Sequence, residues 1–120
     1  MRKYIITAIQ AHAVAEYPKE CCGLLLAIGR KQQYFPCRNV STDPTEEFRI
    51  DPEDYAAAED AGEVIGVIHS HPDATSRPSP RDLAMCEATE LPWHILSWPE
   101  GDLRTITPTG ATPLLKRPFV

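Results

Sequence analysis

The hydrophobic pattern of the chain is dominated by two continuous apolar runs, and each predicts a buried strand. Cys22–Ile28 is apolar apart from one glycine and is followed by the turn residues Gly29-Arg30-Lys31, whereas Val64–Ile68 leads directly to His69. Short unbroken runs bounded by turn residues are typical of strands buried on both faces. Weaker patterns predict four further strands, the last two joined as a hairpin by 99–102: Gln32–Cys37, Glu47–Ile50, Trp93–Trp98 and Leu103–Thr107.

Three stretches have the spacing or the start signals of helices. Residues 4–16 place Ile5, Ile6, Ile9 and Ala13 at intervals of three and four, and Pro18 follows. A second helix is predicted to start at Asp51-Pro52 and to run to about Gly62, and a third to span about 80–90. The pattern as a whole predicts an α/β domain with a single mixed sheet flanked by about three helices.

Length and composition limit the classes of function. The 120 residues predict one domain, 1–120, and the hydrophobic content of 42% and charged content of 24% are ordinary for a globular protein. The net charge is −5 and the Lys and Arg residues are scattered, so we expect no nucleic-acid partner. No apolar run approaches the ~20 residues of a membrane span, and no signal-peptide core follows the amino terminus, so we expect no membrane association. The four cysteines form no C-x-x-C pair and are expected to be reduced and buried.

The second apolar run ends at a candidate metal site, H-S-H-P at 69–72. Residues two apart on a strand point to the same side, so His69 and His71 should direct both imidazoles toward one point, with Ser70 on the opposite face. The loop from Pro72 to Pro80 is long enough to return Asp82 to the same place. Two imidazoles and a carboxylate, with a fourth position open, are the ligand set of a catalytic zinc.

Two further residues are candidates for chemistry. Ser79-Pro80-Arg81-Asp82 fits a helix capping box, but an acid held in the first turn of a helix can still face a metal. Hydrolysis at such a zinc also needs a general base outside the ligand set. Glu20 is the best candidate because it precedes the strand Cys22–Ile28, and Glu16 and Glu63 are weaker rivals.

E-C-C-G-L-L-L at 20–26, H-S-H-P at 69–72 and P-S-P-R-D at 78–82 together resemble the JAMM (MPN-type) zinc metalloprotease family over almost the whole chain. The resemblance implies one zinc per chain on His69, His71 and Asp82, with Glu20 as general acid/base. It also implies that Ser79 hydrogen-bonds the oxyanion of the tetrahedral intermediate. The implied fold is similar to that of cytidine deaminases, a curved mixed sheet flanked by helices.

A narrower resemblance is to the amino-terminal half of lambda-type phage tail assembly proteins, through Y-F-P-C-R-N-V-S at 34–41 and E-F-R-I-D-P-E-D-Y at 47–55. It implies a peptidase or isopeptidase of phage or prophage tail assembly, cytoplasmic in the bacterial host or tail-associated, whose substrate is a protein or peptide such as a tail protein. In longer natural chains it implies a carboxy-terminal cysteine peptidase domain.

Two alternatives stay open at this stage. A zinc deaminase needs H-x-E and P-C-x-x-C motifs, and the chain has neither. A non-catalytic, zinc-bearing structural or docking module of the tail assembly machinery would not require Glu20 or Ser79. The remaining histidines, His12 and His94, are expected to be structural.

Overall fold

A five-stranded sheet organises the computed structural model, which describes residues 1–110. The elements along the chain are α1 (Lys3–Glu16), β1 (Cys22–Ile28), β2 (Lys31–Cys37), α2 (Pro52–Ala61), β3 (Glu63–Pro72), α3 (Pro80–Thr89), β4 (Trp93–Trp98) and β5 (Leu103–Ile106). The strand order is β2-β1-β3-β4-β5; β3 and β4 are parallel and the other neighbours antiparallel. Within the described residues this is one open mixed sheet with three helices, so the predicted α/β class is confirmed.

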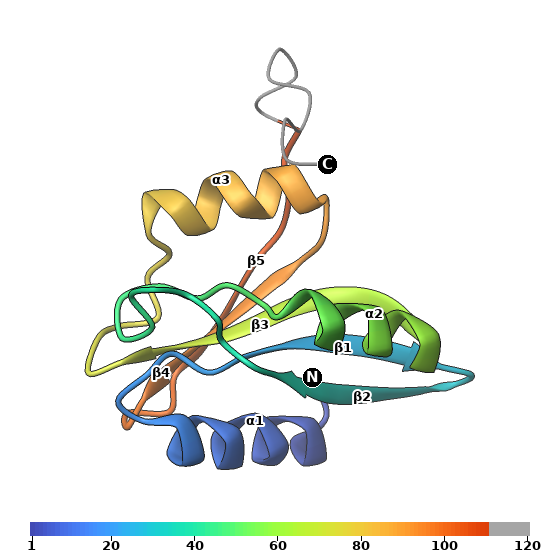
Figure 1. The fold of residues 1–120 in the computed structure, drawn as a ribbon, viewed down its shortest axis with the longest axis horizontal. Helices are drawn as coiled ribbons and strands as arrows, with labels where there is room; N and C mark the ends of the chain where they lie inside the picture. Colours follow the sequence, from blue (N-terminus) through green and yellow to red (C-terminus); the bar gives the residue numbers. More distant parts are fainter. Residues whose placement is uncertain (111–120) are drawn as a thin grey trace.

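The helices cover the two faces of the sheet unequally. α1 lies against one face, and α2 and α3 lie on the other (Figure 1). Residues four apart on α1, Ile5, Ile9 and Ala13, are buried against Leu25 and Ile68. The opposite face of the same strands packs under α2 and α3 in a second cluster that includes Leu24, Leu26, Val67, Ala58 and Cys86. Both faces of β1 and β3 are therefore buried, which is why these strands have continuous apolar sequences.

Most predicted boundaries agree with the structure to within one or two residues. β3 runs through both histidines to Pro72, the residue predicted to end this strand. Ile68 faces α1 and Val67 faces α2, so the alternation along the strand places His69 and His71 on the α2 and α3 face.

The strand predicted at Glu47–Ile50 is wrong. In this stretch the chain forms a loop with a single bridge, between Asn39 and Ile50. The Asn39 side chain competes with strand pairing, because it accepts hydrogen bonds from the backbone N–H groups of Ser41 and Arg49 and donates to the carbonyls of Pro44 and Glu47. The loop is therefore folded around an asparagine and not along a neighbouring strand.

The four cysteines are buried, as the sequence predicted. All four cysteines are free and buried, and burial raises the pKa of each thiol. In the part of the chain that the structure describes, no helix combines the length and apolarity needed to cross a lipid bilayer.

Candidate functional site

Three polar side chains meet where β3 ends, on the face covered by α2 and α3. The Nε2 atoms of His69 and His71 lie 3.2 Å apart. The Asp82 carboxylate lies 3.2 Å from Nε2 of His69 and 3.0 Å from Nε2 of His71. The structure thus brings together the three residues that the sequence selected as ligands.

Asp82 reaches this place through the loop 73–79 and the first turn of α3. Ser79 is the N-cap residue of α3, and its hydroxyl oxygen accepts from the Asp82 N–H at 3.0 Å, while the Ser79 N–H donates to Asp82 Oδ2 at 3.0 Å. The predicted capping box is present, and the same carboxylate faces the histidines. The loop is fastened to the rest of the protein by Ser76, whose hydroxyl donates to Asp102, and by a hydrogen bond from the Asp73 N–H to the Trp98 carbonyl.

Burial and hydrogen bonds shift the pKa of each of these groups. Complete burial lowers the pKa of His69, which keeps the ring neutral despite the nearby Asp82. Burial also acts to raise the pKa of Asp82, but hydrogen bonds from both histidines outweigh it, and the carboxyl pKa lies well below its usual range. Burial acts to lower the pKa of His71, and hydrogen bonds to Asp82 and Thr75 raise it on balance.

The donor set fits a zinc ion. Ligands about 2.0–2.1 Å from a tetrahedral zinc are roughly 3.3 Å from one another, close to the separations of 3.0–3.2 Å seen here. The Nδ1 atom of His71 donates to the Thr75 carbonyl at 2.8 Å, so in the neutral ring it is Nε2 that carries the lone pair for a metal. The Nδ1 atom of His69 has no hydrogen-bond partner among residues 1–110. His69, His71 and Asp82 could therefore hold a metal ion and leave a position open.

Glu20 lies beside this cluster because of the register between β1 and β3. Cys22 pairs with His69 in the antiparallel ladder. Glu20, two residues before Cys22, therefore comes opposite His71, two residues after His69, on the same face of the sheet. The side chain is 6% exposed and lines a cavity of about 220 Å³ together with His71, Ser79 and Asp82. Burial raises the pKa of Glu20 to about 8, although the charge of His71 acts in the opposite direction. A carboxyl of this kind can both accept and release a proton near neutral pH.

The backbone around Glu20 is held by residues whose part the sequence did not indicate. The Glu20 N–H donates to the Pro44 carbonyl at 2.7 Å, and Asn39 donates to the Glu20 carbonyl at 3.0 Å. The Cys21 N–H donates to the buried hydroxyl of Ser70 at 2.8 Å. Ser70 does point away from the histidines, as the alternation predicted. The sequence signal for the hydrogen bond of Ser70 was a serine placed between two histidines on a buried strand. No local sequence pattern indicated the hydrogen bonds of Asn39.

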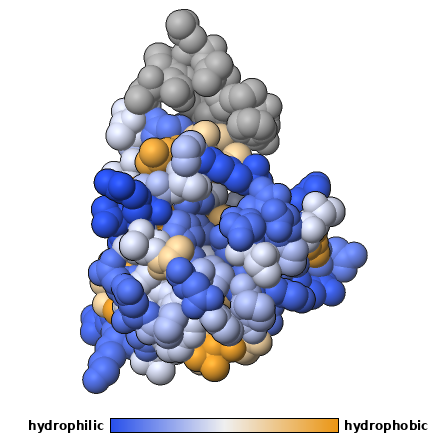
Figure 2. All heavy atoms as spheres, turned by 90° about the vertical axis from the view of Figure 1, so that its left-hand side faces the viewer, coloured by the Kyte–Doolittle hydropathy of each residue, from blue (hydrophilic) through white to orange (hydrophobic). Residues whose placement is uncertain are grey.

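The other wall of the cavity comes from the loop that Asn39 organises. Glu46, Glu47 and Phe48 line the cavity opposite α3, and Arg81 of α3 forms an ion pair with Glu47 at 3.4 Å. The loops 39–50 and 73–79 lie at the same end of the molecule, on the left in Figure 1. Figure 2 faces that end: hydrophilic residues cover most of the surface, and hydrophobic ones form small separate patches.

The rival residues lie elsewhere. Glu63 begins β3 and pairs with Ala27 at the far end of β1, and neither Glu63 nor Glu16 lines the cavity. His12 is hydrogen-bonded to Tyr34 at 2.6 Å and His94 to Thr105 at 2.8 Å, in agreement with their expected structural roles.

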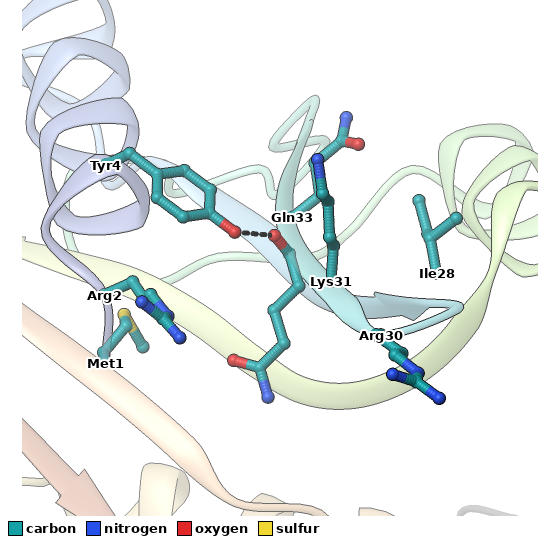
Figure 3. A pocket seen from close by; sticks show the side chains of 8 residues that line it. Met1, Arg2, Tyr4, Ile28, Arg30, Lys31 and Gln33 are labelled. Carbon is teal, nitrogen blue, oxygen red and sulfur yellow. Dashed lines mark hydrogen bonds between the residues drawn. The ribbon is translucent and has the colours of Figure 1, made fainter.

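A larger hollow, of about 1080 Å³, lies at the opposite end of the sheet, beside the β1–β2 turn (Figure 3). Its charged side chains are the cations Arg2, Arg30 and Lys31, and the Tyr4 hydroxyl donates to the Gln32 carbonyl at 2.6 Å across it. It contains no histidine, carboxylate or thiol among its lining residues, so it lacks the side chains that hold a zinc ion.

Comparison with known proteins places this site in a family context. The chain is 64% identical over 120 residues to the tail tip assembly protein K of Escherichia phage N15. The matched region covers 100% of this chain and 49% of the phage protein. It is 34% identical over 102 residues to the CysO-cysteine peptidase of Mycobacterium tuberculosis, covering 78% of this chain and 68% of the relative. The solved structure of DSY2949 from Desulfitobacterium hafniense is similar with a TM-score of 0.67 and 29% identity, over 88% of this chain and 77% of that one.

The family assignment rests on nearly the whole described chain. The chain spans about half the length of its phage relative, so the activity and partners of that longer protein do not transfer directly. The family model of prokaryotic homologs of the JAB domain matches residues 2–108, which include Glu20, Ser79 and the three converging side chains. The chain therefore belongs to the prokaryotic homologs of the JAB domain.

Proposed function

We propose that the protein is a zinc-dependent peptidase or isopeptidase with one zinc per chain, held by His69, His71 and Asp82. The observation that supports this most strongly is the convergence of two imidazole nitrogens and an ionised carboxylate within 3.2 Å, with the buried, high-pKa Glu20 lining the same cavity. Three ligands with one open position are the arrangement of catalytic rather than structural zinc.

Each residue has a distinct part in the proposed reaction. When bound, zinc supplies a Lewis acid that lowers the pKa of water and polarises a carbonyl. Glu20 takes up the proton of the attacking water and returns it to the leaving amine, which its raised pKa permits. The Ser79 oxygen accepts from the Asp82 N–H, so its own proton remains available to donate to an oxyanion in the cavity. The hydrogen bond between His71 and Thr75 fixes the orientation of one ligand ring.

The burial of Glu20 favours an enzyme over a purely structural or docking module. An acid that is 6% exposed and carries a pKa of about 8 destabilises the fold at neutral pH, because its charged form is disfavoured. A structural zinc gains nothing from such a group. Acids kept at a cost to stability beside a metal site are typical of catalytic centres.

The relatives support a setting for the reaction. The phage protein that is similar over the whole chain is a tail tip assembly protein, and the mycobacterial relative is a peptidase by name. The proposed substrate is accordingly a protein or peptide met during tail assembly, in the cytoplasm of the bacterial host or on the tail itself. In the proposed natural context a carboxy-terminal cysteine peptidase domain follows this one.

The test combines metal analysis with turnover. Protein loaded with zinc should contain about one zinc per chain and cleave members of a peptide and isopeptide library, and Glu20→Gln should keep the zinc and lose the cleavage. Zinc binding without turnover of any library member would favour the structural module. Failure to bind zinc at all would remove both readings of the site.

A further inference from the structure

A second cavity, of about 180 Å³, lies behind Phe48, next to the cavity that contains Glu20. It opens between the start of α2, the inner face of α3 and the sheet. Most of its walls are aromatic or aliphatic side chains: Phe48, Ile50, Tyr55, Val67, Met85 and Trp93. Protein interiors normally leave few voids larger than a water molecule, so an apolar cavity of this size is unusual. Apolar cavities of similar size can bind apolar ligands.

The two cavities share a wall. Phe48, Arg81 and Asp82 line both of them. The Phe48 ring is stacked on His69 with its centroid 4.5 Å away and is tilted against Trp93 at 5.4 Å. A group in the second cavity would therefore be separated from the histidines by the thickness of one aromatic ring.

The chemistry of the walls selects an apolar occupant. The Trp93 indole N–H already donates to Thr89 at 3.0 Å, and the Thr89 hydroxyl donates to the Cys86 carbonyl at 3.2 Å. The charged groups are Arg49 and Arg81, both exposed, together with the Asp82 carboxylate that contacts the histidines. The interior thus offers packing surface but few free hydrogen-bonding groups, and its volume is close to the ~150 Å³ of a cavity that binds benzene.

We propose that this cavity binds an apolar side chain of the substrate, of the size of leucine or phenylalanine, within two residues of the bond that is cleaved. This inference rests on the proposed peptidase function, because it assigns the cavity to the same substrate. The shared wall sets the short distance along the substrate, since an extended chain advances only ~3.3 Å per residue. The cavity makes the enzyme selective without contacting the reacting atoms.

Met85 provides a way to close the cavity. It lies three residues after Asp82 on α3 and so points to the same side of the helix. Met85→Trp should fill the space, whereas Leu83→Trp adds the same ring to a 50% exposed position of the same helix and serves as the matched control. Met85→Ala should enlarge the cavity and remains informative if the tryptophan variant fails to fold.

The first assay compares peptides that differ only in having alanine, leucine or phenylalanine at one of the two positions on either side of the scissile bond. At one position the wild type should prefer leucine or phenylalanine over alanine by at least ~10-fold in kcat/KM. Met85→Trp should abolish that preference, Met85→Ala should shift it toward larger side chains, and Leu83→Trp should keep it. Equal preference in wild type and Met85→Trp would overturn the proposal.

The second assay does not require turnover. Trp93 lines the cavity, so its indole N–H resonance should shift when metal-free Glu20→Gln protein is titrated with N-acetyl-phenylalaninamide, while that of Trp98 should not. Added Met85→Trp should suppress the shift. If the wild type cleaves no peptide, the proposed function fails, yet this titration still decides whether the cavity binds an apolar side chain. An unmoved Trp93 resonance, or one that moves equally in the closed variant, would refute the inference.

Discussion

Replacing Glu20 by glutamine should stabilise the metal-free protein at neutral pH while it removes turnover. The carboxyl pKa is about 8 in the folded protein and about 4.5 when unfolded, with burial as the main cause. Between these values the folded state holds a proton that the unfolded state has lost, so stability falls as pH rises. The slope is about 1.4 kcal/mol per pH unit. Glutamine has no such proton, so the two proteins should differ by about 1 kcal/mol at pH 5 and by roughly 4 kcal/mol at pH 7.5.

The measurement is the free energy of unfolding in urea, with a chelator present, at several pH values from 5 to 7.5. The histidines and Asp82 also titrate with folding, but they are common to both proteins, and the difference isolates Glu20. Glu46→Gln is the matched control, because Glu46 is an exposed acid that lines the same cavity, and its replacement should change stability by less than about 0.5 kcal/mol. Zinc should reduce the slope for the wild type, since a nearby cation favours the ionised carboxyl.

A difference between wild type and Glu20→Gln that stays constant from pH 5 to 7.5 would refute this reasoning, because it would mean that Glu20 ionises freely in the fold. In the zinc-loaded enzyme the same substitution should lower kcat by ~10²–10⁴-fold, the usual contribution of a general base. Unchanged kcat with full zinc content would move the base to another residue.

Alanine at His69, His71 or Asp82 should abolish zinc binding, and the zinc affinity of the wild type should weaken below about pH 6 as the imidazoles take up protons. Elemental analysis tests the first expectation and a zinc titration the second. Retention of zinc by any variant would exclude the replaced residue as a ligand. Ser79→Ala should cost about 1 kcal/mol as a lost helix cap and lower kcat by ~10²–10³-fold. Ser79→Asn should recover the melting temperature alone, and activity that tracks stability in both variants would reduce Ser79 to a cap. Ser70→Ala leaves the buried Cys21 N–H without its acceptor, so it should cost about 1–3 kcal/mol and lower kcat at full zinc content; Ser70→Thr should restore both, and an unchanged kcat in the alanine variant would separate this hydrogen bond from the placement of Glu20.

Local sequence determined the elements and part of the site. The unbroken apolar runs specified β1 and most of β3, because a strand covered by helices on both faces needs apolar residues throughout. Asp51-Pro52 and Ser79-Pro80 specified the starts of α2 and α3, because cap and proline act on the backbone beside them. The strand period alone placed His69 and His71 on one face.

Tertiary structure decided what lies beside that face. Glu20, Glu16 and Glu63 were all candidates in the sequence, and only the pairing of Cys22 with His69 brings Glu20 opposite His71. The predicted strand at Glu47–Ile50 failed for a related reason, because the side chain of Asn39, eight residues before Glu47, binds the Glu47 carbonyl and the Arg49 N–H. Strand register, and hydrogen bonds from a side chain to the backbone of another segment, both depend on residues outside a short sequence window. Hydrophobic periodicity within such a window therefore contains no information about either.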